Sequence, residues 1–170
     1  MDEKQLVISA KSGSGEAFAE LYSLYKDRLY RYAFYRLQSR EDAEDAVSAC
    51  IISAFRQIHN LKKPEAFSSW IFRILYCACN EQISAQNMRR QMADINELEN
   101  HLSSDFSETI EKTELQQALG LLKDDEREIV LLSVVSGFNS KEIGKITDLS
   151  SGAVRSKLSR SLKKMREFLE

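Results

Sequence analysis

Apolar residues recur along the first half of the chain with the spacing of amphipathic helices. Two stripes, within residues 18–33 and 43–58, follow i, i+3, i+4 and i+7 spacing. Ser39 precedes the second stripe as a cap and is followed by an acidic first turn. Pro64 suits the first turn of a third helix. The inward positions expected for these three helices are Phe18, Leu21, Tyr22, Tyr25, Leu29, Tyr32, Ala33, Ala43, Val47, Cys50, Ala54, Ile58, Phe67, Trp70, Ile71, Ile74, Ala78 and Ile83.

The periodicity fades between Gln91 and Glu114, where seven acidic residues stand against one lysine. This composition is typical of a linker. We therefore expect an all-α chain of two small helical domains, residues 1–90 and 113–170, joined by a flexible acidic linker over residues 91–112.

The second half of the pattern ends in a short helix, a tight turn and a longer helix. Short apolar stripes precede them, and the turn is expected at residues 148–150. The final helix is expected to turn Val154, Leu158, Leu162, Met165 and Leu169 inward. This order is the pattern of a helix-turn-helix, whose second helix meets base edges in the major groove.

The final helix is also basic. Residues 141–170 hold eight lysines and arginines against four acidic residues. Basic residues near a helix C-terminus can simply complement the helix dipole. Arg155 and Lys157 lie at the opposite end, where positive charge is unfavourable unless an anion approaches. The pattern therefore favours a DNA-reading helix.

The overall composition limits the remaining classes of function. The chain has 24 basic and 26 acidic residues, so the whole protein has little attraction for DNA phosphates. Three cysteines and no long apolar run predict a cytoplasmic protein without disulfides or membrane insertion. Cys77 and Cys79 point about 200° apart on a helix, which favours core packing over a metal site. No grouping of side chains indicates an enzyme, a cofactor or a small-molecule substrate.

Several stretches together resemble the extracytoplasmic-function sigma factors of bacterial RNA polymerase. Residues 122–132, 137–144 and 151–160 are similar to region 4 of that family. Residues 42–47 are similar to region 2.2, and residues 67–74 with Asn80 to regions 2.3 and 2.4, ending in Arg89 and Arg90. The resemblance covers nearly the whole chain in the family's order. It implies a factor that binds core RNA polymerase and directs promoter-specific initiation, with an anti-sigma factor as a further partner.

The resemblance also implies roles for particular residues. The first set would dock on the polymerase clamp: Asp42, Asp45, Ser48, Ala49 and Ile52. The second would contact the minus-ten element, including a flipped base: His59, Asn60, Lys62, Lys63, Asn80, Ser84, Asn87, Arg89 and Arg90. The third would read the minus-35 element: Ser151, Gly152, Ala153, Arg155, Ser156, Lys157 and Arg160.

The chain departs from the family at a few positions. Ser48 and Ala49 replace the usual Gln-Glu on the clamp-binding helix, and Ala153 replaces a typical threonine at the start of the reading helix. Two alternatives therefore stand beside a sigma factor. One is a helix-turn-helix regulator that binds DNA without polymerase. The other is an interaction protein derived from a sigma factor that has lost polymerase binding.

Overall fold

The computed structural model describes residues 1–95 and 113–170, and every regular element in these two ranges is helical. The expected acidic linker, residues 91–112, therefore lies mostly outside the described residues. We call residues 1–95 the first domain and residues 113–170 the second domain. Within the described ranges no helix is long and apolar enough to cross a membrane.

The first domain begins with a helix that the hydrophobic pattern did not predict. Helix α1 spans Glu3–Lys11 and is capped by Asp2, whose side chain accepts a hydrogen bond from the Gln5 amide at 2.8 Å. Leu6 and Val7 are buried against α2. Three buried positions in nine residues are too few for a clear periodic signal, so the cap is the feature that could have revealed this helix.

Helices α2 and α3 form the centre of the first domain. Helix α2 spans Gly15–Leu37 and α3 spans Arg40–Gln57, with Ser14 and Ser39 as their caps. The expected inward residues of both helices are buried except Tyr22, which is 36% exposed and belongs to the outer face. Three-residue 3-10 turns, η1 (Ile58–Asn60) and η2 (Pro64–Ala66), connect α3 to the next helix.

Helix α4 is the longest helix and spans Phe67–Ile95. Its buried face packs on α2 and α3 through Phe67, Ile71 and Leu75. The prediction that Cys77 and Cys79 of α4 both pack in the core is right for Cys79. It is wrong for Cys77, which is exposed. Burial raises the pKa of the Cys79 thiol to about 12, so this side chain behaves as an apolar core residue.

The second domain contains four helices and a π-helical segment. Helices α5 (Glu114–Gly120) and α6 (Asp124–Val130) lead into the segment η4 (Leu131–Val135). Helices α7 (Ser140–Thr147) and α8 (Ser151–Leu169) follow, with Asn139 and Ser150 as their caps. Val154 and Met165 of α8 are buried as expected. The expectation for Leu169 is wrong, because its side chain is 51% exposed.

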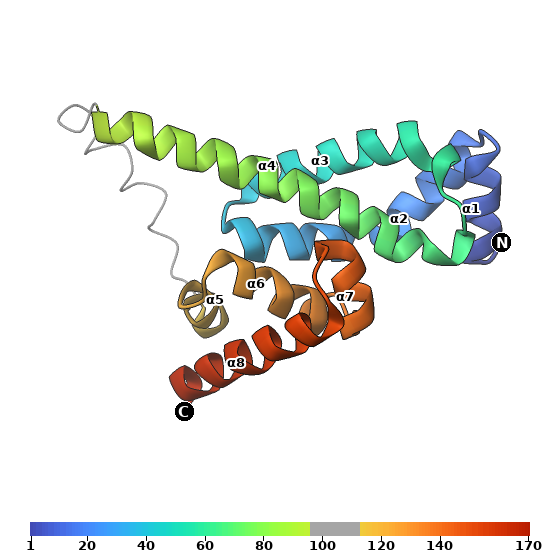
Figure 1. Ribbon diagram of the computed structural model, residues 1–170. Helices are drawn as coiled ribbons and strands as arrows, with labels where there is room; N and C mark the ends of the chain where they lie inside the picture. The colour runs from blue at the N-terminus through green and yellow to red at the C-terminus, as the bar shows by residue number, and fades with distance from the viewer. Residues whose placement is uncertain (96–112) are drawn as a thin grey trace.

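The two domains pack against each other and share one continuous core. Helix α7 lies on α4, and η4 and α6 lie on α2 (Figure 1). The rings of Phe72 and Phe138 meet edge to face across this boundary at 5.0 Å between centroids. Both side chains are buried. The domains therefore form a closed arrangement, which the local sequence pattern left open.

Candidate nucleic-acid and polymerase interfaces

The turn between α7 and α8 fixes the direction of the basic helix. Asp148 ends α7 in the left-handed region at φ 63°. A Cβ atom at Gly144 would lie 2.6 Å from the carbonyl oxygen of Leu149, so this contact requires glycine. The Ser150 hydroxyl then accepts a hydrogen bond from the Ala153 amide at 3.1 Å and starts α8. The sequence prediction of a helix-turn-helix at these residues is confirmed.

The outer face of α8 presents a group of polar and basic side chains. Arg155, Ser156, Ser159 and Arg160 line one shallow depression in the surface. All four are exposed. Gly152 is exposed as well, whereas Ser151 and Ala153 are half-buried at the first turn. The structure thus brings most residues of the expected minus-35 set to one accessible face.

Lys157 lies on a different side of α8. Its ammonium group contacts Asp125 Oδ2 of α6 at 2.7 Å. A hydrogen bond from Lys157 lowers the pKa of the Asp125 carboxyl below its ordinary value. Lys164 similarly contacts Glu126 at 3.1 Å. These two lysines therefore join α8 to α6, while Arg155 and Arg160 extend into solvent.

The expected polymerase-binding residues lie along one side of α3. Asp45, Ser48, Ala49 and Ile52 are exposed, and Ile52 is 53% exposed despite being apolar. Asp42 is half-buried because its carboxylate accepts a hydrogen bond from Gln86 of α4. The hydrophobic pattern missed one neighbour of this surface: Phe55 is 57% exposed and its ring packs edge to face on Phe18. Exposed apolar side chains beside acidic ones are typical of a protein-binding surface.

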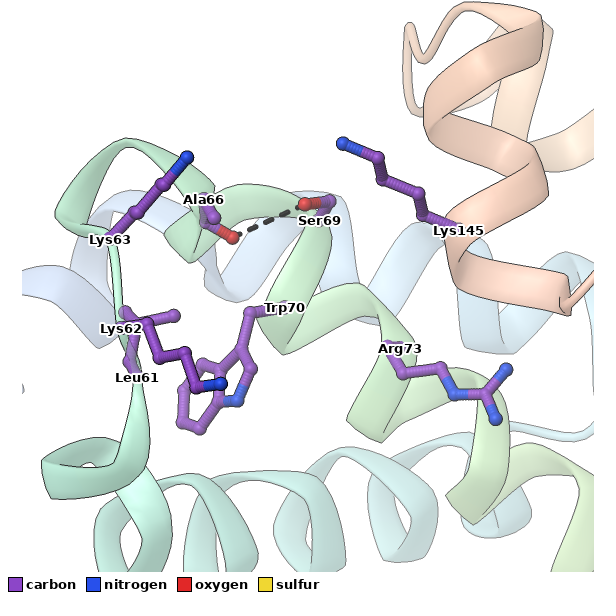
Figure 2. Close-up of a pocket in the computed structure, with 8 residues that line it drawn as sticks. All are labelled: Leu61, Lys62, Lys63, Ala66, Ser69, Trp70, Arg73 and Lys145. Carbon is purple, nitrogen blue, oxygen red and sulfur yellow. Dashed lines mark hydrogen bonds between the residues drawn. The ribbon is translucent and has the colours of Figure 1, made fainter.

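A cavity of about 340 Å³ lies beside the loop that joins α3 to α4 (Figure 2). Its first-domain lining includes Lys62, Lys63, Trp70 and Arg73, and Lys145 of α7 contributes from the second domain. His59 and Asn60 are exposed in the preceding turn. The cavity combines an aromatic ring with several cations, which are groups that bind a base and its phosphates. Sequence reasoning anticipated the loop residues and assigned Trp70 to the core, but it did not anticipate Arg73 or Lys145.

The remaining minus-ten residues lie on α4, and one of them differs from the others. Ser84, Asn87, Arg89 and Arg90 are exposed. Asn80 is half-buried, and its side-chain oxygen accepts a hydrogen bond from Arg36 of α2. In this arrangement Asn80 therefore faces the boundary between the domains.

Arg36 is a fully buried cation at that boundary, with a side chain that is 0% exposed. Its guanidinium lies 2.9 Å from Glu128 Oε2 and 3.2 Å from Asp124 Oδ2, both on α6. It also donates to the Tyr32 hydroxyl at 3.2 Å and to the Tyr76 carbonyl at 3.3 Å. The hydrophobic pattern did not indicate this cluster, because its acidic members lie 88 and 92 positions from Arg36.

Burial and the neighbouring charges together set the protonation of this cluster. Loss of hydration raises the pKa of Glu128 to about 7, although the nearby Arg36 charge opposes that shift. Burial also disfavours the charged form of Arg36, but Tyr32, Asp124 and Glu128 raise the pKa of Arg36 above its ordinary value. Arg36 therefore stays charged, and Glu128 titrates near neutral pH.

Two further arginines of the first domain reach the second. Arg28 of α2 donates to the Ser136 carbonyl at 2.8 Å, and its guanidinium lies over the rings of Phe72 and Phe138. Arg73 of α4 donates to the Ile146 carbonyl and contacts Asp148 Oδ2 at 2.7 Å. Arginines 28, 36 and 73 thus connect α2 and α4 to the second domain.

Comparison with known proteins assigns both domains to known families. Residues 21–89 match the family model for Sigma-70 region 2, and residues 112–165 match that for Sigma-70, region 4. RNA polymerase sigma factor SigV of Bacillus subtilis is 30% identical over 142 residues, which cover 84% of each chain. ECF RNA polymerase sigma factor BldN of Streptomyces coelicolor is 26% identical over 97% of this chain, which spans only 65% of the length of BldN.

Solved structures share the fold. CnrH, solved in complex with the cytosolic domain of CnrY, superposes with a TM-score of 0.75 at 21% identity, covering 98% of this chain and 96% of CnrH. The sigma factor RpoE of Bartonella quintana, solved with the anti-sigma factor NepR, gives 0.71 at 23% identity, covering 89% of this chain and 96% of RpoE. At these identities the superpositions establish the fold.

Proposed function

The chain belongs to the extracytoplasmic-function family of RNA polymerase sigma factors, and on that premise we propose that it binds core RNA polymerase and directs promoter-specific transcription initiation. The observation that carries the proposal is the accessible face of Arg155, Ser156 and Arg160 on the second helix of a helix-turn-helix. The family matches in both domains support the same function.

Helix α8 reads the minus-35 element in the major groove. Exposed arginines near the start of such a helix can contact guanine with two hydrogen bonds, and each such pair discriminates by about 1 to 3 kcal/mol. Arg155 has this position on α8, and Arg160 is exposed near the middle of the helix. Lys157 contributes less to base reading, because its ammonium group already pairs with Asp125. The first-turn residues Ser151, Gly152 and Ala153 contribute backbone contacts at the start of α8.

The first domain recognises the minus-ten element. Unstacking a base costs a few kcal/mol, and a pocket must recover that energy through stacking and hydrogen bonds. The cavity beside Lys62 and Lys63 has Trp70 as its aromatic side chain. His59 and Asn60 are exposed in the turn that precedes the lining residues, and Ser84, Asn87, Arg89 and Arg90 extend the contact along α4.

The acidic and apolar side of α3 binds the polymerase. Asp42, Asp45, Ser48, Ala49 and Ile52 form this surface, and Phe55 enlarges its apolar part. A net charge of −2 is consistent with a protein whose non-specific phosphate contacts are supplied by the polymerase. The protein then acts where the polymerase acts, in the cytoplasm, as an initiation factor and not as an enzyme. It needs no cofactor and no small-molecule substrate, and an anti-sigma factor is its proposed regulator.

Run-off transcription from a library of promoter fragments tests the proposal. Purified core polymerase with this protein should initiate from a restricted set of sequences, and core polymerase alone should not. Arg155→Ala should lower promoter-directed transcription about tenfold, the value of one base-specific contact, with unchanged binding to core polymerase. Arg166→Ala, at an exposed arginine far along the same helix, is the matched control and should change transcription less.

The other outcomes identify the alternatives. Binding to duplex DNA without any binding to core polymerase would make the protein an independent helix-turn-helix regulator. Failure in both assays would leave an interaction protein derived from a sigma factor. Equal loss of polymerase binding and transcription in Arg155→Ala would contradict the separate roles of α3 and α8.

A further inference from the structure

We propose that the acidic first turn of α6 limits sequence-independent DNA binding by α8, because Asp125 and Glu126 hold Lys157 and Lys164 away from DNA phosphates. This role rests on the part of the proposed function in which α8 meets DNA. Neither carboxylate belongs to the proposed DNA-binding or polymerase-binding sets. Both are positioning residues, which act on DNA through the lysines that they hold.

Helix α8 carries two groups of basic side chains. Lys157 and Lys164 are nearly two helical turns apart and therefore lie on one side of the helix. Ser161 lies between them on that side and is fully buried. Helix α6 packs on this inner side (Figure 1). The other group consists of exposed cations without an ion pair to any described residue: Arg155, Arg160, Lys163 and Arg166.

Each lysine of the inner group is held by a carboxylate of α6. The Lys157 ammonium lies 2.7 Å from Asp125 Oδ2, and only 28% of the lysine side chain is exposed. The Lys164 ammonium lies 3.2 and 3.1 Å from the two carboxylate oxygens of Glu126. The Lys157 hydrogen bond lowers the pKa of Asp125, and the Lys123 amide together with Lys164 lowers the pKa of Glu126. Both carboxyls are therefore ionised at neutral pH.

The two carboxylates differ in their other tasks. Glu126 Oε1 also accepts a hydrogen bond from the Lys123 amide at 3.0 Å and so completes the cap of α6. The Asp125 side chain is 50% exposed. A change at Asp125 therefore alters the charge beside Lys157 with little loss of packing. A change at Glu126 must keep the oxygen that accepts from Lys123.

Pairing with a carboxylate reduces phosphate binding by a lysine in two ways. The lysine must leave its carboxylate before it contacts a phosphate, and the carboxylate itself repels the phosphates. Partly exposed ion pairs are weak, so DNA can compete for the lysine and the reduction is graded. A lysine that reaches a phosphate strengthens binding whatever the base sequence. The α6 carboxylates therefore lower the affinity of α8 for any duplex.

This reduction suits a protein that shares its DNA contacts with polymerase. The chain carries a net charge of −2, so its attraction for DNA must be local. With Lys157 and Lys164 withheld, that attraction rests mainly on the outer cations of α8. The free chain then binds unrelated DNA weakly. Sequence preference comes from base contacts of side chains such as Arg155 once polymerase supplies the phosphate contacts.

Fluorescence anisotropy tests the role of Asp125, with the full chain and a labelled duplex of random sequence over a series of salt concentrations. Asp125→Asn keeps the size of the side chain and removes its charge. It should raise the affinity a few-fold at low salt. The plot of log K against log salt concentration should become steeper by up to about 0.9, the value of one more phosphate contact. Glu126→Gln keeps an acceptor for the Lys123 amide and should act in the same direction through Lys164.

Glu167→Gln is the matched control for the change of charge. It removes one negative charge from an exposed position on α8 that forms no ion pair with any described residue. Weaker long-range repulsion should raise its affinity slightly and leave the salt slope unchanged. An equal gain and an equal slope in Asp125→Asn and Glu167→Gln would overturn the release of a lysine.

Lys157→Gln in two backgrounds identifies the lysine that is released. It should lower the affinity for the random duplex a few-fold more in Asp125→Asn than in the wild type, and it should return the salt slope to the wild-type value. An equal loss in both backgrounds would overturn the proposal. So would an Asp125→Asn protein with wild-type affinity and slope, or one that binds no DNA at low salt.

Run-off transcription with core polymerase distinguishes this role from the proposed function. A steeper salt slope in Asp125→Asn without initiation by any variant would support the role of α6 and overturn the sigma-factor function. Wild-type binding to random DNA by an Asp125→Asn protein that still directs promoter-specific initiation would overturn the role of α6 and leave the sigma-factor function intact.

Discussion

The helices assigned to DNA, α4 and α8, differ in what covers them. Helix α8 has a free outer face with Arg155 and Arg160 in solvent, because its neighbours α5, α6 and α7 all lie on its other side. Helix α4 has a comparable polar face, but Arg73 and Asn80 on it are engaged at the domain boundary. Polar side chains on a helix surface therefore do not by themselves make an accessible site.

The difference comes from packing between domains. The face of α4 turned to the boundary carries groups that pair with particular atoms of the second domain, such as the carbonyl of Ile146. On α8 the corresponding pairs, Lys157 with Asp125 and Lys164 with Glu126, stay inside one domain and leave the outer face open. The accessibility of the polar face of α4 therefore depends on packing between the domains, whereas that of α8 does not.

The largest expected effect comes from removing the aromatic contact that covers α4. Phe138 is 5% exposed and its ring meets Phe72. Phe138→Ala should lower the free energy of unfolding by about 3 kcal/mol, because it leaves a cavity in the shared core. Urea unfolding measures the change. Phe168→Ala, at a ring 42% exposed on α8, is the control and should cost less than about 1 kcal/mol. If both variants lose the same free energy of unfolding, the boundary between the two domains is poorly packed.

The next effect is a pH dependence of closure. A carboxyl whose pKa rises from 4.5 to about 7 on burial favours the closed form below pH 4.5, and this contribution is lost as the pH rises through 7. Arg36, Asp124, Asp125 and Lys157 are the charged groups that act on Glu128. The ratio of closed to open protein should fall about tenfold between pH 6 and pH 8.

Small-angle X-ray scattering across that pH range measures the ratio. Glu128→Gln retains the shape of the protonated side chain and should stay closed without this pH dependence. If Glu128→Gln keeps the full pH dependence of closure, another titratable group is responsible for it.

The smallest effect concerns the exposed ion pair at the edge of α4. The Asp148 side chain is 75% exposed, and its pair with Arg73 is therefore screened by solvent. Asp148→Asn should lower the free energy of unfolding by about 0.5 kcal/mol or less. Asparagine also tolerates the left-handed backbone at this position. Asp148→Ala should cost about 1 kcal/mol more, because alanine is strained there. Thermal unfolding of both variants tests the order.

Local sequence was sufficient for most of the helices. The stripes of α2, α3 and α8, the cap at Ser39, and the turn before α8 all depend on residues within a few positions of each other. Periodicity and capping act at that range, so they can be read from the chain. Helix α1 was missed because a short helix gives too little periodic signal, although Asp2 and Gln5 form its capping box.

The candidate sites were only partly determined in this way. Sequence placed Arg155 on a reading helix, but only the folded structure turned Lys157 toward Asp125. The family resemblance assigned Asn80 to the minus-ten element, but the fold pairs it with Arg36, and the carboxylate partners of Arg36, Glu128 and Asp124, come from the second domain. These partners are far apart along the chain, and no local spacing specifies such a contact. The helices and the reading face therefore follow from the sequence pattern, whereas the packing of the two domains, the buried Arg36 cluster and the raised pKa of Glu128 arise only from tertiary structure.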